Sequence, residues 1–197
     1  PQVWQELGLF REEMPVLLAG HVHIARERSV GLIDAPYMGL PAATIQRVAS
    51  TVIEVITIEN KTTFHSEAKR RQDDRALLIY TAGMPSPAWR AMYGRLLGSL
   101  PPTTPIHHWG DVDEGGFRIA STVAAVARAA GFALQPYRMS PKDVPLEMRV
   151  RASARTLERI QHFASSAGWS ELGQAIREAE FVAEQEALDR DPHNDWC

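Results

Sequence analysis

The chain has 197 residues, of which 45% are hydrophobic and 23% are charged, and its formal net charge is −3. This composition excludes a disordered chain and predicts one compact domain. The single cysteine, Cys197, excludes a disulfide scaffold. No apolar run approaches the ~20 residues that a membrane-spanning helix needs, and Pro1 to Val3 do not begin a signal peptide, so we expect a cytoplasmic protein, either processed or part of a longer chain.

The first 50 residues are predicted to form a lead-in segment. Residues 20–26 alternate polar and apolar side chains, which predicts a short strand. Residues 34–41 are rich in turn formers, and Pro41 is predicted to open a helix that ends near Ala49.

From residue 51 onward, strands alternate with helices. The predicted strands are residues 52–58, 76–81, 105–109 and 132–138, and the helices between them are 62–71, 88–100 and 117–130. Thr62 or Thr63 is expected to cap the first of these helices, and Ser86 with Pro87 the second. Short strand–helix–strand connections predict a parallel sheet covered by helices, with the Pro136 strand at its edge. Two more helices, about 146–164 and 170–188, are predicted to finish the chain.

Acidic side chains follow two of the predicted strands. Glu59 comes after the first strand, and Asp111 and Asp113 come after the third. Ligands of an open parallel sheet bind beyond the carboxyl ends of its strands, and carboxylate oxygens are suited to Mg²⁺. The alternative is that Asp111 and Asp113 only shape a turn and cap the helix at Phe117. The mild net acidity argues against binding nucleic acid through bulk charge, but not against binding phosphates through metal ions.

Three strand ends carry a resemblance to a known family. They read Ile58-Glu59-Asn60, Gly83-Met84-Pro85-Ser86, and Trp-Gly-Asp-Val-Asp-Glu-Gly-Gly-Phe over residues 109–117. The chain resembles a Toprim domain and, more narrowly, the C-terminal nuclease domain of the JetD family of Wadjet anti-plasmid systems, which is related to the A subunit of topoisomerase VI. The resemblance covers about residues 30–140 well and the final helices, including residues 184–186, more loosely.

The resemblance implies an α/β fold, a Toprim-like (Rossmann-like) parallel sheet flanked by helices, with a C-terminal helical extension. The lead-in segment is then 1–50, the Toprim core 51–140 and the C-terminal helices 141–197. The implied activity is that of a divalent-metal-dependent DNA endonuclease. Its partners would be plasmid double-stranded DNA, an SMC-like Wadjet complex and a second copy of the chain in a homodimer.

The family's site residues transfer to numbered positions of this chain. Glu59 matches a glutamate that serves as a metal ligand or as an acid/base. Asp111 and Asp113 match the aspartates that hold Mg²⁺ or Mn²⁺, and Glu186 is a further candidate ligand. The expected contacts to phosphate or DNA are Gly83, Ser86, Gly116, Lys61, Arg151 and Arg155.

The arginines at 151, 155 and 159 are spaced four apart on one predicted helix face, as is suitable for phosphate contacts. A solvated helix face is the alternative, and it also applies to the basic run 69–71. His21 and His23 are candidate zinc ligands, but no cysteine or further His-x-His pair completes such a site.

Three other functions compete with the nuclease. One is a non-catalytic Toprim-fold scaffold that binds DNA or a partner. Another is a DNA-cleaving subunit like topoisomerase VI A, which attacks DNA with a tyrosine; we interpret Tyr37, Tyr80, Tyr93 and Tyr137 as packing or surface residues, which favours hydrolysis by water. A haloacid-dehalogenase-type phosphatase also uses Asp-x-Asp, but that class needs Thr or Val where this chain has Gly115.

Overall fold

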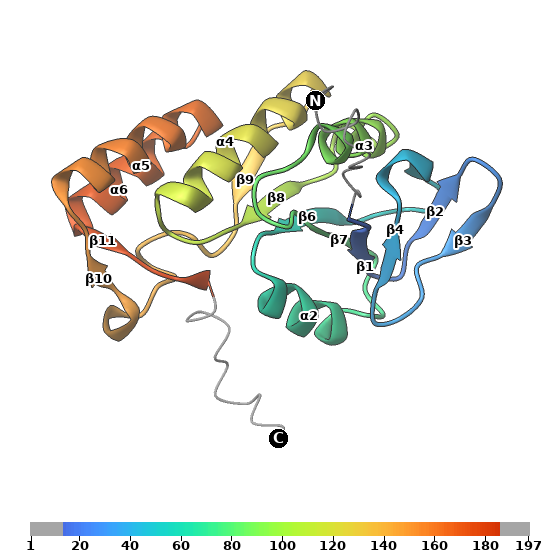
Figure 1. The fold of residues 1–197 in the computed structure, drawn as a ribbon, viewed down its shortest axis with the longest axis horizontal. Coiled ribbons are helices and arrows are strands. Elements are labelled where there is room, and N and C mark those ends of the chain that lie inside the picture. Colours follow the sequence, from blue (N-terminus) through green and yellow to red (C-terminus); the bar gives the residue numbers. More distant parts are fainter. Residues whose placement is uncertain (1–13, 186–197) are drawn as a thin grey trace, which may run out of the picture.

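The structure is a computed structural model that describes residues 14–185, and a six-stranded sheet lies at its centre (Figure 1). The strand order is β4-β1-β7-β6-β8-β9. The strands are β1 (Val16–Ala19), β4 (Met38–Leu40), β6 (Glu54–Ile58), β7 (Ala76–Tyr80), β8 (Ile106–Trp109) and β9 (Leu134–Pro136). The last four run parallel, whereas β1 and β4 are antiparallel to their neighbours.

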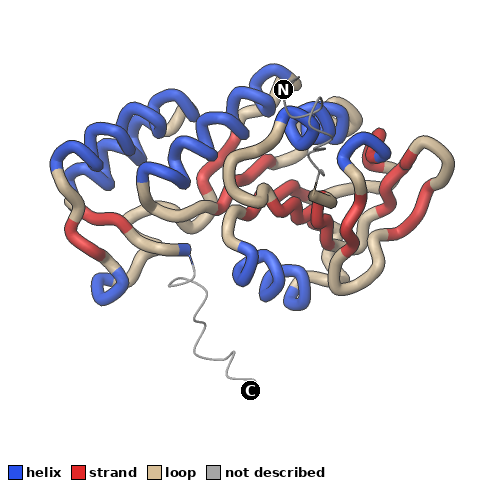
Figure 2. Tube along the Cα trace, viewed as in Figure 1, coloured by secondary structure: helices blue, strands red, loops and turns tan. Residues whose placement is uncertain are grey.

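Helices cover both faces of this sheet. In Figures 1 and 2, α2 (Lys61–Arg70) lies on one face, and α3 (Pro87–Leu97) and α4 (Glu114–Ala129) lie on the other. Phe64 and Ala68 of α2 pack against Ile56 and Leu78 in a smaller buried cluster. The larger cluster lies on the α3 and α4 side, and it continues to α5 (Ala154–Ala167) and α6 (Ser170–Ala179), which extend the fold beyond α4.

This architecture confirms the predicted α/β class, with a Rossmann-like, mostly parallel sheet flanked by helices and a C-terminal helical extension. The strand and helix order predicted from residue 51 to 138 is present. β9 is an edge strand, as Pro136 indicates, because a proline has no N–H to donate to a further strand. Ser86 caps α3 and Pro87 is its first residue, as predicted.

The lead-in segment differs from the prediction. It contains β1 and β4 of the central sheet and a second, antiparallel sheet of β3 (Val30–Leu32), β2 (His23–Arg26) and β5 (Ile45–Val48). The helix predicted from Pro41 to Ala49 is wrong: a short 3₁₀ turn, Ala42–Thr44, leads directly into β5. Ile45 and Val48 point inward from β5, which suits a strand that pairs with β2.

The helix ends also require corrections. Asn60, rather than Thr62 or Thr63, caps α2, with its side chain accepting from Thr63 N–H at 3.1 Å. The helix predicted over 146–164 begins only at Ala154, after a 3₁₀ turn, Leu146–Met148, and the strand β10 (Val150–Arg151). The helix predicted over 170–188 is too long: α6 ends at Ala179, because Glu180 adopts a left-handed backbone conformation that turns the chain into β11 (Phe181–Val182).

None of the helices in the range 14–185 combines the length and the apolar character that crossing a membrane requires.

Candidate active site

The carboxyl ends of β6 and β8 bring the predicted acidic residues together. The two strands are parallel neighbours with Ile58 opposite Trp109. The ladder continues one step further, because the Glu59 N–H donates to the Trp109 carbonyl at 3.0 Å. The loop that carries Asp111 and Asp113 therefore starts beside Glu59.

Glu59 is half-buried and lies among like charges. Its Oε2 accepts from the Asp111 N–H at 3.4 Å. The pKa of Glu59 is raised from 4.5 to about 7, mainly by burial and then by the negative charge of Asp111. Within this net shift, Asp113 and Glu184 also raise the pKa, and the hydrogen bond from the Asp111 N–H lowers it. Keeping the Glu59 carboxyl ionised in this position costs free energy, and a nearby cation would offset that cost.

Asp113 also has a structural task. It is the N-cap of α4, and its Oδ1 accepts from the Gly116 N–H at 2.7 Å. The helix thus begins at Glu114, three residues before the predicted start at Phe117. The capping interpretation is correct for Asp113, and the second carboxylate oxygen, Oδ2, takes no part in the cap.

Two glycines allow the loop to fold tightly around the acids. A Cβ on Gly116 would lie 2.1 Å from the Asp111 carbonyl oxygen, and a Cβ on Gly110 would lie 2.6 Å from Glu59 Oε2. A side chain at either position would push the loop away from Glu59. The Gly116 contact gives this glycine a packing role, while its expected approach to a phosphate stays a prediction.

The end of the described chain closes over the acids. Ala183 forms a bridge with Val112, and the Gln185 N–H donates to Asp111 Oδ1 at 2.6 Å. The side chain of Gln185 is fully buried, and its Oε1 accepts from the Asn60 N–H at 2.9 Å. Gln185 therefore ties the end of β6 to the loop after β8, a role that sequence reasoning missed.

Of the two glutamates that flank Gln185 in the sequence, only Glu184 lies within the described residues. Glu184 is exposed, and its charge contributes to the raised pKa of Glu59. Glu186, the predicted extra ligand, lies outside the described residues. The only signal in the sequence for an acidic residue near Glu59 from this part of the chain was the Glu-Gln-Glu string at residues 184–186, and the string does not show where the segment packs.

His108 is fully buried next to the loop that carries Asp111 and Asp113. Burial lowers its pKa to about 3, so the imidazole is neutral, and its Nδ1 lies 2.8 Å from Thr57 Oγ1. Its buried Nε2 has no hydrogen-bond partner within the described part of the chain. The Cβ position of Gly110 lies 2.9 Å from this Nε2 and 2.6 Å from Glu59 Oε2, so the two side chains face the same small space.

The donor chemistry of this cluster fits a hard cation. Mg²⁺ and Mn²⁺ prefer carboxylate oxygens, which Glu59, Asp111 and Asp113 supply, and the buried charge of Glu59 calls for compensation. Across residues 14–185, however, no three His, Cys, Asp or Glu side chains already stand close enough together to hold a metal ion. Binding would therefore need the carboxylates to close in, and the metal site stays a prediction.

The predicted contacts Gly83 and Ser86 follow β7, and the predicted contact Lys61 lies at the start of α2. Burial and the charge of Glu59 raise the pKa of Tyr80, so the end of β7 lies near the acids. Gly83 follows this strand with φ +75°, a conformation that favours glycine, and the Ser86 hydroxyl accepts from the Trp89 N–H at 3.2 Å. Lys61 is the first residue of α2 and is exposed.

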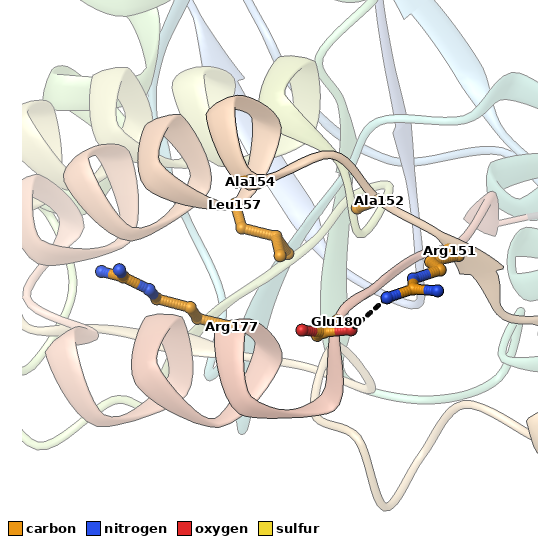
Figure 3. A pocket seen from close by; sticks show the side chains of 6 residues that line it. All are labelled: Arg151, Ala152, Ala154, Leu157, Arg177 and Glu180. Atoms are coloured by element: carbon orange, nitrogen blue, oxygen red, sulfur yellow. Dashed lines mark hydrogen bonds and ion pairs between the residues drawn. The ribbon is translucent and has the colours of Figure 1, made fainter.

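Arg151 and Arg155 do not share a helix as predicted. Arg151 lies in β10, where it forms an ion pair with Glu180 at 3.2 Å, and Arg155 is exposed on α5. Arg159 forms an ion pair with Glu114 at 2.6 Å. A pocket of about 320 Å³ lies beside Arg151 and is lined also by Arg177 and Leu157, whose side chains are drawn in Figure 3. The predicted arginine row on one helix face is therefore wrong, because α5 starts after Arg151.

The other weighed residues do not form a second site. His21 and His23 are both exposed, and neither belongs to a group of three or more candidate metal ligands among residues 14–185. Tyr93 is fully buried, and the ring of Tyr137 packs near His107 and Trp109. These positions agree with packing rather than with an attacking tyrosine.

Fold and site together define a Rossmann-like α/β domain with a cluster of carboxylates at the carboxyl ends of two neighbouring parallel strands. The family model described as "Wadjet protein JetD, C-terminal" matches residues 11–197. The chain therefore belongs to this family, the C-terminal part of the JetD proteins of Wadjet anti-plasmid systems. A comparison with curated proteins gives no match.

Proposed function

We propose that this chain is a divalent-metal-dependent DNA endonuclease of the Toprim type, acting on plasmid DNA within a Wadjet system. The observation that carries the proposal is the meeting of Glu59 and the Asp111 loop at the ends of β6 and β8, with a Glu59 pKa raised to about 7. Membership of the JetD family supports the same function, because the family belongs to anti-plasmid systems.

Glu59, Asp111 and Asp113 are the proposed ligands of Mg²⁺ or Mn²⁺. When bound, such an ion supplies Lewis acidity to a phosphate and to the attacking water. The protein's own part is to hold the ligands. Gln185 fixes Asp111 through its N–H, and the N-cap bond to Gly116 fixes Asp113 at the start of α4. The pKa of about 7 belongs to Glu59 without a metal ion, and a cation bound beside it would favour the ionised carboxylate that coordinates the metal. If Glu59 is not itself a ligand, it is instead suited to exchange a proton with the reacting groups.

We also propose the assembly that this function requires. Cutting both strands of a duplex calls for two sites, so the active form would be a homodimer that works in the cytoplasm beside an SMC-like complex. Family membership supports only the coarser statement that the chain works with other Wadjet subunits.

A scaffold that binds DNA or a partner without cutting is the second candidate. Two observations favour it: Asp113 is already engaged as a helix cap, and the carboxylates do not stand in a ready-made ligand group within residues 14–185.

Nicking of supercoiled plasmid separates the two functions. The test uses Asp111→Asn with Asp113→Asn, in Mg²⁺ or Mn²⁺ and with EDTA. An asparagine at 113 keeps an oxygen for the Gly116 N–H, so the helix cap survives. Asp73→Asn, at an exposed aspartate, is the matched control. We expect EDTA and the double substitution each to abolish nicking, and the control to keep it. A wild-type chain that binds plasmid but does not nick it would favour the scaffold, and unchanged nicking by the double variant would overturn the proposed site.

A further inference from the structure

One face of α2 concentrates positive charge. The chain contains only three lysines, and two of them, Lys61 and Lys69, lie on this helix with His65 midway between them. Positions four residues apart fall on the same side of a helix, so the three side chains form one row. Both lysines are exposed, and neither forms an ion pair within residues 14–185.

The neighbouring cations of α2 behave differently. Arg70 pairs with Glu67, and Arg71 pairs with Glu54 and Asp74. The Arg70 pair lies within α2, and the Arg71 pair with Glu54 ties the end of α2 to β6, whereas the charges of the two lysines are left for solvent or a partner.

The middle of the row is built around His65. Partial burial, then Lys61 and then Lys69, lower the pKa of this imidazole, and no carboxylate is among the causes. The ring of Tyr37 stacks on it, with centroids 4.8 Å apart and an interplanar angle of 5°. We call Lys61, His65, Lys69 and Tyr37 the α2 cationic face.

The position of Lys61 is not explained by helix stability. It is the first residue of α2, next to the capping Asn60, and the first turn contains no acidic residue. The N-terminal end of a helix carries partial positive charge, so a lysine there is repelled rather than stabilised. The same residue lies two positions after Glu59, which puts the start of the cationic face at the border of the carboxylate cluster.

We propose that the α2 cationic face binds the phosphate backbone of double-stranded DNA next to the phosphate that the carboxylates attack. This inference rests on the proposed function, which makes DNA the substrate. From Lys61 to Lys69 the helix rises about 12 Å, at 1.5 Å per residue, so the two ammonium groups reach different phosphates of one strand. A chain with a net charge of −3 needs such a local positive surface to hold a polyanion.

Lysine acetylation followed by mass spectrometry tests this directly, because the third lysine, Lys142, is exposed and is an internal control. The 197-residue chain is labelled with and without a linear duplex, in EDTA so that cleavage plays no part. We expect DNA to slow the labelling of Lys61 and Lys69 several-fold and to leave Lys142 unchanged. Equal labelling rates with and without DNA at both lysines of the cationic face would overturn the inference.

Salt dependence of binding gives a second readout. Each lysine that neutralises a phosphate contributes about 0.9 to the slope of log K against log salt concentration. Lys61→Gln with Lys69→Gln should therefore reduce the slope by about 2, whereas Lys142→Gln should leave it unchanged. An unchanged slope for the double variant would contradict the proposal.

The outcomes separate this inference from the proposed function. Metal-dependent cleavage without protection of Lys61 and Lys69 would overturn the cationic face alone, and protection without any cleavage would overturn the nuclease alone. If the other Wadjet subunits protect the two lysines and DNA does not, the face is a protein interface and the inference is wrong.

Discussion

Glu59→Gln should stabilise the metal-free protein, and only at neutral to alkaline pH. Folding raises the pKa of this carboxyl from 4.5 to about 7, mainly through burial and the charge of Asp111. The folded state therefore prefers the protonated form, and ionisation costs nothing below pH 4.5, increasingly more between pH 4.5 and 7, and a constant amount above pH 7. The difference amounts to roughly 3 kcal/mol at 1.36 kcal/mol per pKa unit.

A neutral, similarly shaped glutamine removes this cost. Urea unfolding in EDTA should show the variant more stable than the wild type by about 2–3 kcal/mol at pH 8, and nearly equal at pH 4.5. Glu54→Gln is the matched control at the other end of β6: Glu54 pairs with Arg71, so this substitution should destabilise the protein at pH 8. If the Glu59 variant and the wild type differ by the same amount at both pH values, Glu59 is not a strained, buried carboxyl and our account of the cluster is wrong.

Two further predictions concern the loop and its closure. Gly116→Ala should destabilise the protein by about 2 kcal/mol or more, because the new Cβ would lie 2.1 Å from the Asp111 carbonyl oxygen. Gly83→Ala should cost only about 1 kcal/mol, because its Cβ would meet no neighbouring atom and only the positive φ is unfavourable. Equal urea midpoints for the two variants would contradict the close approach at Gly116. Gln185→Ala should cost about 1–3 kcal/mol, since the Asn60 N–H loses its acceptor, and unchanged thermal unfolding would show that the closure adds no stability.

The parallel half of the fold was predictable because its signals are local. β6 is dense in β-branched residues and β7 is a continuous apolar run, as expected for strands covered by helices on both faces. Ser86 and Pro87 are a helix start that needs no tertiary information. Once these elements are placed in order, the proximity of Glu59 and Asp111 follows from strand pairing, although the role of both residues stays a prediction.

The lead-in segment was not predictable in the same way. Residues 41–48 begin with Pro41, which suits the first turn of a helix, but they also contain Ile45 and Val48, which suit a strand. The choice depends on β2, which lies about twenty residues earlier and pairs with β5. Antiparallel edge strands of three or four residues carry too little periodicity for such pairing to be inferred.

The role of Gln185 and the turn at Glu180 were not predicted because they depend on long-range contacts. Gln185 bonds to Asn60 and Asp111, 125 and 74 residues away, and no pattern near residue 185 indicates that the chain turns back at Glu180. Asp113 illustrates the opposite case, in which both the helix cap and the candidate ligand were visible in the sequence. A residue can serve both purposes, because a carboxylate has two oxygens.

Anomalous diffraction from a crystal soaked in Mn²⁺ tests the central claim most directly, that the acids after β6 and β8 share one divalent ion. We expect a manganese peak within coordinating distance of Glu59, Asp111 and Asp113, and the loss of this peak in the Asp111→Asn, Asp113→Asn variant. A crystal of the wild type with no peak among these three carboxylates would contradict the account.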